Sequence, residues 1–242
     1  MSGTLTTENE LRRRSRRELL KLLPLGVLGA FLFETPQRWL LTKGLAFSDA
    51  FSHLAFRHGS MAQEFRDSDV APFDKFPYNF WDVADPGLDL DAWTLRVEGQ
   101  VQRPGNYRLA DFKNLPPHRQ NTRHVCVEGW DVIGNFGGTR LSEVLSMVGA
   151  DTSAKYLYFE CGDDYYQSID MDSALHPQTL ACWEMYGRPL TRGHGAPLRI
   201  VIPTKLGYKQ PKYVEKMVVT NVLRHGHRGY WEDQGYSWFG GL

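Results

Sequence analysis

The pattern of apolar positions after residue 90 predicts a series of short strands. Residues 93–98 alternate between apolar and polar side chains, as expected for a half-buried strand. Runs rich in β-branched and aromatic residues predict further strands over residues 122–127, 155–161, 165–169, 180–185, 198–202 and 214–222. Helical spacing is clear only over residues 141–148, and a second short helix is expected over residues 109–115. Many strands and few helices predict an α+β domain built on mixed β-sheets.

Segments between these runs are expected to be loops. Residues 51–90 are aromatic, acidic and interrupted by proline, which indicates loops with short helices. Residues 129–138 are rich in glycine and are expected to form a loop after the strand 122–127. The aromatic tail, residues 230–239, has two interpretations: it covers the core, or it lines the mouth of a cleft or a surface for a partner.

The N-terminus carries an export pattern. Six basic residues crowd together before an uncharged run over residues 22–33, namely Arg12, Arg13, Arg14, Arg16, Arg17 and Lys21. Twelve apolar residues are too short for a membrane span, which needs about 20, but they suit the apolar region of a signal. The segment 15–21 resembles a twin-arginine export signal, cleaved or kept as an anchor; the alternative is an amphipathic helix on a membrane surface. We expect residues 1–50 to be signal and linker, and residues 51–242 to be the catalytic domain.

Composition excludes several classes of protein. Lys and Arg number 28, and Asp and Glu number 28, so no overall positive charge favours nucleic acid. With 42% hydrophobic and 23% charged residues, the chain is not disordered, and three cysteines are too few for a disulfide scaffold. The chain has no phosphate-binding Walker loop, dinucleotide fingerprint, zinc helix or haem attachment motif. A signal for export in the folded state favours an enzyme that acquires a cofactor in the cytoplasm.

Cys126 is the most unusual candidate for chemistry. It stands at the end of a predicted strand, within Arg123-His124-Val125-Cys126-Val127-Glu128-Gly129-Trp130. It is either a buried apolar side chain or a thiolate whose pKa is lowered by neighbouring Arg123 and His124. A thiolate ligand suits a soft or high-valent metal centre. Cys161 and Cys182 are expected to be small buried side chains in neighbouring strands, with a disulfide as the alternative.

Two glycine-bearing loops with basic residues follow. Residues 192–199 contain His194 and Arg199, and residues 203–212 contain Lys205, Lys209 and Lys212. Basic side chains on glycine-bearing loops, whose backbone can come close to a bound phosphate, are typical of phosphate binding. The alternative is a pair of surface turns with solvated charges.

Six motifs in order resemble one family. They are Cys126-Val127-Glu128-Gly129-Trp130 and the segments 154–160, 171–177, 186–190, 194–199 and 207–209. Together they resemble the molybdopterin-binding catalytic domain of the sulfite oxidase family, over roughly residues 76–223. The resemblance is closest to the branch with the periplasmic methionine sulfoxide reductase catalytic subunit.

This resemblance implies one molybdenum on one molybdopterin, with Cys126 as the metal ligand. It implies cofactor contacts from two loops and two further regions, at His194, Arg199, Gln210, Pro211, Lys212, Asn79, Trp81, Asp82, Cys161 and Asp163. Residues 78–82 correspond, to within one residue, to an Asn-Phe-Tyr-Glu stretch through which the family contacts the cofactor. Tyr165 matches the active-site tyrosine of sulfite oxidases, and Arg123 is a candidate catalytic cation beside the metal loop.

The chain departs from sulfite oxidases next to the metal ligand. Those enzymes follow their cysteine with Ala-Gly-Asn-Arg-Arg, whereas Glu128, Trp130 and Asp131 stand here. A sulfite dianion needs converging cations, so we expect reduction of a small neutral sulfoxide or N-oxide. The alternatives are a sulfite oxidase or dehydrogenase and a metal-free exported binding module. We expect an exported, periplasmic monomer that uses the twin-arginine machinery and a separate electron carrier, a membrane b-type cytochrome or a soluble cytochrome c.

Overall fold

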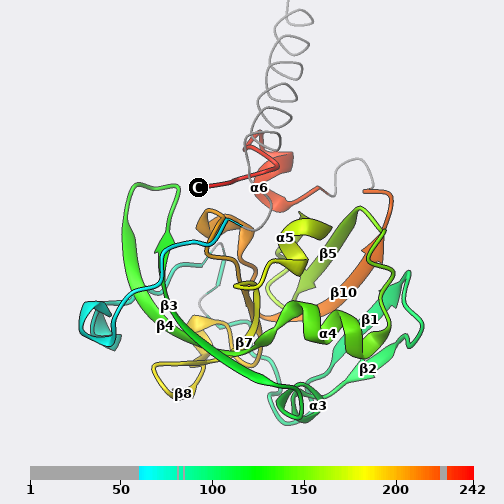
Figure 1. The fold of residues 1–242 in the computed structure, drawn as a ribbon, viewed down its shortest axis with the longest axis horizontal. Helices are drawn as coiled ribbons and strands as arrows, with labels where there is room; N and C mark the ends of the chain where they lie inside the picture. Colours follow the sequence, from blue (N-terminus) through cyan, green and yellow to red (C-terminus); the bar gives the residue numbers. More distant parts are fainter. Residues whose placement is uncertain (1–59, 81, 84, 224–227) are drawn as a thin grey trace, which may run out of the picture. The chain divides into compact units, whose positions relative to one another are not determined.

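Two five-stranded β-sheets organise the part of the chain that the computed structural model describes, residues 60–80, 82–83, 85–223 and 228–242 (Figure 1). These residues all fall within the unit Ser52–Leu242. The expected export segment and Trp81 lie outside the described residues. Within the described ranges, no helix combines the length and apolar character that a membrane span requires.

The first sheet has the strand order β2-β1-β10-β5-β6. Its strands are β1 Leu95–Gly99, β2 Gly105–Tyr107, β5 Tyr156–Cys161, β6 Tyr166–Asp170 and β10 Val214–Thr220. β1 pairs with β10 in parallel, whereas the other neighbours are antiparallel. The sheet is therefore mixed, as the sequence predicts.

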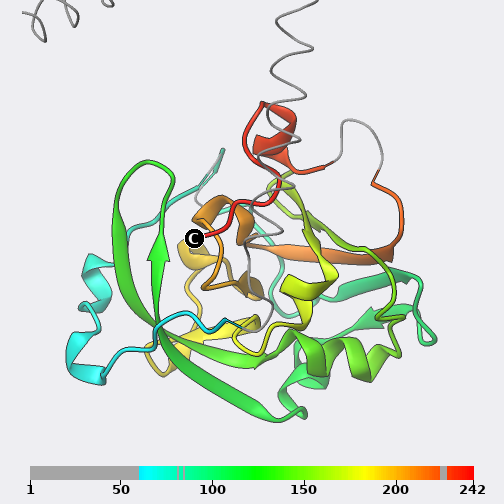
Figure 2. The same cartoon turned by 45° about the horizontal axis from the view of Figure 1, so that its top comes forward.

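The second sheet is built on a long hairpin. It has the order β3-β4-β7-β8, with β9 also paired to β7, and its strands are β3 Pro117–Val125, β4 Asp131–Arg140, β7 Leu180–Met185, β8 Arg188–Pro189 and β9 Arg199–Val201. β3 and β4 are antiparallel over their full length and curve together at one side of the fold (Figures 1 and 2). The turn between them begins at Cys126, whose backbone N–H donates to the Trp130 carbonyl over 2.9 Å. The hairpin therefore presents Cys126 at its tip.

The expected loop over residues 129–138 is wrong, because most of this glycine-rich segment forms β4. A Cβ atom at Gly138 would lie 2.1 Å from the Ala181 carbonyl oxygen of β7. A Cβ atom at Gly134 would lie 2.8 Å from the Phe76 ring. Glycine is needed here for close packing within a strand rather than for a turn.

Few and short helices complete the described fold. They are α3 Leu109–Lys113, α4 Leu141–Val148, α5 Met171–Leu175 and α6 Tyr230–Asp233, with the 3-10 helices η1 Asp67–Asp69, η2 Phe73–Lys75, η3 Arg192–His194 and η4 Gly207–Lys209. α4 coincides with its predicted range and ends at Gly149, whose φ of 62° is left-handed. Its apolar face is buried through Leu141, Val144, Leu145 and Val148, each contributing about 1.5–3 kcal/mol.

Two hydrophobic clusters form the core. The larger one joins α4 to the first sheet and includes Val97, Leu157, Phe159 and Met217. The smaller one lies on the second sheet around Phe136 and Met185. All three cysteines are buried free thiols, so no disulfide joins Cys161 to Cys182. The α+β class with mixed sheets is confirmed.

Candidate functional site

A cleft beside the tip of the β3–β4 hairpin gathers most of the predicted site residues. Its empty volume is about 960 Å³, part of which is open to solvent. Residues from six separate segments line it, namely Phe76, Pro77, Asn79 and Phe80; His124, Val127, Glu128 and Trp130; Asp163 and Tyr165; Gly193, His194 and Arg199; Gly207, Tyr208, Gln210, Pro211 and Lys212; and Trp231 and Tyr236.

Cys126 lies at the hairpin tip, next to this lining. Its side chain is 7% exposed, and Sγ accepts a hydrogen bond from Asn79 Nδ2 over 3.5 Å. Glu128 Oε2 lies 3.6 Å from the same sulfur. Burial, together with the Glu128 carboxylate, raises the pKa of Cys126. The thiol is therefore not activated by its protein neighbours, and a bound cation is needed to favour the thiolate.

Arg123 does not point at the cleft, contrary to the expectation of a cation beside the metal loop. Successive residues of a strand face opposite sides, so Arg123 faces away while His124 faces the cleft. The Arg123 guanidinium forms an exposed ion pair with Asp131 instead. His124 is buried, and burial, with help from Arg199, lowers its pKa to about 3, so its ring is neutral. Neither residue lowers the pKa of Cys126.

His194 occupies a buried aromatic corner. Its Nε2 faces the Phe76 carbonyl at 3.5 Å, so Nε2 carries the proton and Nδ1 accepts from Thr191 Oγ1 over 2.8 Å. The Tyr78 ring lies 4.4 Å from the His194 ring. Burial lowers the pKa of His194 to about 4, so it is a neutral hydrogen-bonding group.

Arg199, which is buried, and Lys212, which is partly buried, place two basic side chains at the cleft. Arg199 is 4% exposed, donates from Nη1 to the His194 carbonyl over 3.2 Å and lies above the Phe136 ring. Lys212 Nζ donates to the Gly193 carbonyl over 2.9 Å. Burial, reinforced by Arg199, lowers the pKa of Lys212 to about 7. None of the ion pairs among the described residues includes either side chain.

Polar atoms without partners point to a ligand of mixed charge and hydrogen-bonding character. Arg199 Nε, His124 Nδ1 and Gln210 Oε1 are buried and make no hydrogen bond within the described structure. Such groups are costly unless a ligand satisfies them. Glycine keeps the loops close here, because a Cβ atom at Gly207 would lie 2.8 Å from His124 Nε2. The donors and cations suit an anionic ligand with several polar edges.

Tyr165 and Asp163 enter the cleft from the end of β5. The Tyr165 hydroxyl donates to the Tyr208 carbonyl over 2.6 Å, and burial raises its pKa well above the usual value. The Tyr165 hydroxyl therefore stays protonated and ties β6 to η4. Asp163 Oδ1 accepts from the Tyr165 backbone N–H over 3.3 Å, and burial raises the Asp163 pKa.

Two expected cofactor contacts lie elsewhere in the described structure. Cys161 faces the larger core from β5 and is absent from the cleft lining. Burial raises its pKa well above the usual value, as for an inert core thiol. Asp82 is exposed and also does not line the cleft. Pro211 and Gln210, by contrast, line it as expected.

Sequence reasoning missed several lining residues. His124 shares its strand face with the position of Cys126, so the two-residue period of a strand could have identified it. Phe76 follows the short 3-10 helix η2 and Tyr208 lies within η4, and neither segment is long enough to give a periodic signal. Trp231 and Tyr236 line the cleft while Phe239 of the same tail is buried, so the tail serves both of its expected roles.

Comparisons with known proteins agree on one family. Residues 82–231 match the oxidoreductase molybdopterin binding domain. A protein of Azospira oryzae named as subunit YedZ1 of a protein-methionine-sulfoxide reductase is 46% identical over 168 residues, covering 69% of this chain and 63% of that protein. The protein-methionine-sulfoxide reductase catalytic subunit MsrP of Xanthomonas axonopodis pv. citri is 33% identical, covering 90% of this chain and 75% of that protein.

A solved structure shares the fold. The sulfane dehydrogenase SoxCD of Paracoccus pantotrophus matches with a TM-score of 0.52 and 20% identity, covering 56% of this chain and 40% of that chain. The family match and the relatives, rather than this structure, confirm the resemblance that the sequence motifs indicate. The chain belongs to the family of oxidoreductases with a molybdopterin-binding domain.

Proposed function

We propose that this chain is a molybdenum-molybdopterin oxidoreductase that reduces a small neutral oxide, a sulfoxide in the first place. The observation that carries the proposal is the pair of basic side chains, the buried Arg199 and the partly buried Lys212, which lack ion-pair partners in the described structure and line the same cleft as the neighbours of Cys126. Two relatives bear the name of protein-methionine-sulfoxide reductases, which favours a sulfoxide over other oxides.

The residues present fit this cofactor. Arg199 and Lys212 would bind its phosphate, and the unpaired polar atoms of His124 and Gln210 would bind polar edges of the pterin. Cys126 Sγ would bind the metal, with Asn79 fixing the orientation of the sulfur. The bound group supplies two-electron oxygen-atom transfer. The protein contributes binding, orientation and exclusion of water.

Charge near Cys126 favours a neutral substrate over sulfite. Glu128 lines the cleft beside the sulfur, whereas Arg123 is paired with Asp131 outside it. Lys205 is buried against Asp170, and Arg188 lies over the Phe73 ring, so neither lines the cleft. A dianion beside Glu128 would be repelled, whereas a neutral S=O group needs only one or two donors.

Export and electron supply complete the proposal. The segment 15–21, followed by the apolar run 22–33, supports twin-arginine export to the periplasm as a folded protein. Electrons would come from a separate cytochrome, a membrane b-type or a soluble c-type. Changing Arg16 and Arg17 together to Lys should leave folded protein in the cytoplasm, and unchanged export of that variant would exclude this route.

The function is tested by loading and kinetics together. The full chain is produced in a molybdopterin-competent host, and its molybdenum and pterin are measured per protein. Steady-state rates are then compared for sulfoxide and N-oxide reduction with a reduced viologen, and for sulfite oxidation with an artificial acceptor. The proposal expects sulfoxide reduction to dominate. Efficient sulfite oxidation without sulfoxide or N-oxide reduction would contradict it, and a chain that takes up neither molybdenum nor pterin would indicate a binding module.

A further inference from the structure

The C-terminal segment, residues 228–242, supplies an aromatic wall of the cleft. Trp231 and Tyr236 line the cleft, and their ring centroids lie 5.2 Å apart. Tyr236 is 38% exposed and also contacts the Tyr208 ring at 5.5 Å. Two aromatic side chains therefore line the site from a segment that is distant in sequence from Cys126.

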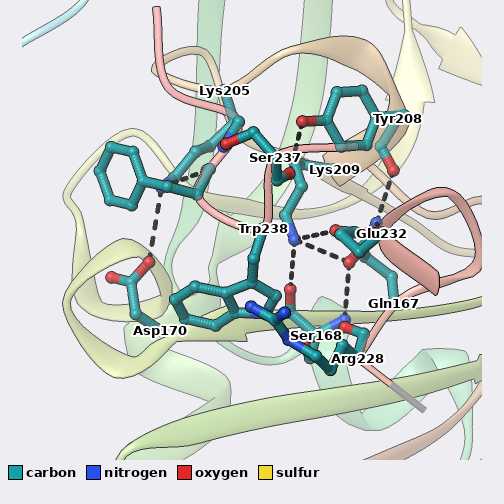
Figure 3. A network of polar contacts seen from close by, with 12 residues as sticks. Gln167, Ser168, Asp170, Lys205, Tyr208, Lys209, Arg228, Glu232, Ser237 and Trp238 are labelled. Carbon is teal, nitrogen blue, oxygen red and sulfur yellow. Dashed lines mark hydrogen bonds and ion pairs between the residues drawn. The ribbon is translucent and has the colours of Figure 1, made fainter. Parts of the chain in front are cut away.

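A buried ion pair attaches this wall to the rest of the fold. Lys209 of η4 pairs with Glu232 of α6, with side-chain exposures of 1% and 0% (Figure 3). Lys209 Nζ also donates to Gln167 Oε1 over 2.8 Å and to the Ser168 carbonyl over 2.7 Å. The lysine therefore joins α6 to β6 through three acceptors.

Further contacts attach the remainder of the segment to the loop after β9. Lys205 Nζ donates to the Phe239 carbonyl over 2.8 Å, and its ammonium lies 3.2 Å from the centre of the Phe239 ring. The Tyr208 hydroxyl donates to the Ser237 carbonyl over 2.7 Å (Figure 3). Figure 2 shows the C-terminal segment running beside this loop. Gly207 of the same loop lines the cleft. These contacts therefore hold the aromatic wall and the cofactor-facing loop together.

A fully buried ion pair is a poor source of net stability, because desolvation of both charges offsets much of their attraction. Its charges do, however, fix the relative orientation of the two elements, since a displaced partner would leave a buried charge unpaired. The Lys209–Glu232 pair therefore suits an element that must be held in one position. In α6, Trp231 directly precedes Glu232. This links the pair to the position of one cleft-lining ring.

We propose that Trp231 and Tyr236 form a subsite for the apolar substituents of a sulfoxide substrate, and that the Lys209–Glu232 pair positions it. The proposal rests on the proposed function. The S=O group is polar, but the carbon groups on its sulfur are apolar and pack well against aromatic faces. Substrates with an aryl or extended thioether group gain from this wall, whereas dimethyl sulfoxide is too small to use it.

The subsite is tested with the cofactor-loaded full chain. KM and kcat are measured for methyl p-tolyl sulfoxide and dimethyl sulfoxide in wild type, Trp231→Ala, Trp231→Phe and the control Tyr158→Ala, a residue of β5 that does not line the cleft. We expect Trp231→Ala to raise KM for the aryl substrate roughly tenfold and to change KM for dimethyl sulfoxide less than about twofold. Trp231→Phe should recover most of the difference. Equal changes for both substrates, at unchanged molybdenum content, would overturn the subsite.

The positioning pair is tested by a different readout. Glu232→Gln is compared with Glu160→Gln, which removes a carboxylate from an exposed ion pair with Lys216. We expect Glu232→Gln alone to speed amide hydrogen exchange over residues 229–236 and to reduce the preference for the aryl substrate. Unchanged exchange and unchanged preference in Glu232→Gln would refute the positioning role.

The subsite and the proposed function can fail separately. If loaded wild type reduces no sulfoxide, the function fails, and binding of methyl p-tolyl sulfoxide is then followed by saturation-transfer NMR. Binding by wild type that is lost in Trp231→Ala but kept in Tyr158→Ala would still support the subsite. No binding by wild type, or equal binding by Trp231→Ala, would overturn it.

Discussion

Asn79 donates a hydrogen bond from Nδ2 to Sγ of Cys126 over 3.5 Å, although 47 residues separate them. This contact fixes the direction of the sulfur from outside the hairpin that carries it. We expect Asn79→Ala to lower cofactor retention about five-fold, since one such hydrogen bond contributes about 1 kcal/mol. Pterin released per protein measures the effect, and Asn106→Ala on β2 is the matched control. Equal pterin in both variants would show that Asn79 does not act on the site.

Substitution of Arg199 should weaken cofactor binding without weakening the fold. Arg199→Met keeps most of the side-chain volume but removes a buried cation without an ion-pair partner in the described structure. Each lost charge-assisted hydrogen bond to an anion costs about 1.5–3 kcal/mol, so pterin retention should fall at least roughly ten-fold. The thermal stability of the cofactor-free protein should not fall in parallel, because an unpaired buried charge is removed. Arg119→Met, in an exposed pair with Glu184, is the control. A parallel fall in stability and retention would contradict the assignment.

Lys212 predicts how stability depends on pH in the cofactor-free protein. Its pKa is about 7 in the folded state, lowered from 10.5, so the unfolded state binds more protons between these values. Wild type should therefore gain stability relative to Lys212→Met as pH rises from about 7 to about 10. Below pH 7 both states are protonated and the difference should be constant. Denaturant midpoints of both proteins across this range measure it, and a flat difference above pH 7 would be evidence against a buried lysine.

The sequence predicted the parts of the fold that have a periodic signal. Strand alternation and the face of Leu141, Val144 and Leu145 gave most strands and α4 within a few residues. β4 is not evident from the sequence, because its glycines are typical of turns, whereas the fold uses Gly134 and Gly138 for close packing within a strand.

Parts of the candidate site followed from motifs, and others did not. The loops with Arg199 and Lys212 reach the cleft, as the resemblance implied. The expected positions of Cys161 and Arg123 at the cleft are wrong. A motif does not say which face of a strand a side chain lies on, and a shift of one residue turns the side chain to the opposite face. The sequence indicates the aromatic tail as one possible lining of a cleft but does not single out Trp231, since its place depends on the pair between neighbouring Glu232 and the distant Lys209.

Substitution of Arg123 tests its position outside the cleft. Its guanidinium is exposed and paired with Asp131 outside the cleft. Arg123→Ala should therefore leave kcat, KM and molybdenum content within about twofold of wild type, because it removes no group that contacts a substrate. A large fall in kcat with normal molybdenum content would restore a catalytic role for this residue.

The central claim is that Cys126 binds molybdenum in this cleft, and X-ray absorption at the molybdenum edge tests it most directly. Wild type and Cys126→Ser are compared, with Cys182→Ser as a control for loss of a buried thiol away from the cleft. We expect Cys126→Ser to lose activity and to show one fewer sulfur neighbour at the metal than wild type, while Cys182→Ser keeps the wild-type spectrum. The same number of sulfur neighbours in Cys126→Ser, at equal molybdenum content, would contradict the account.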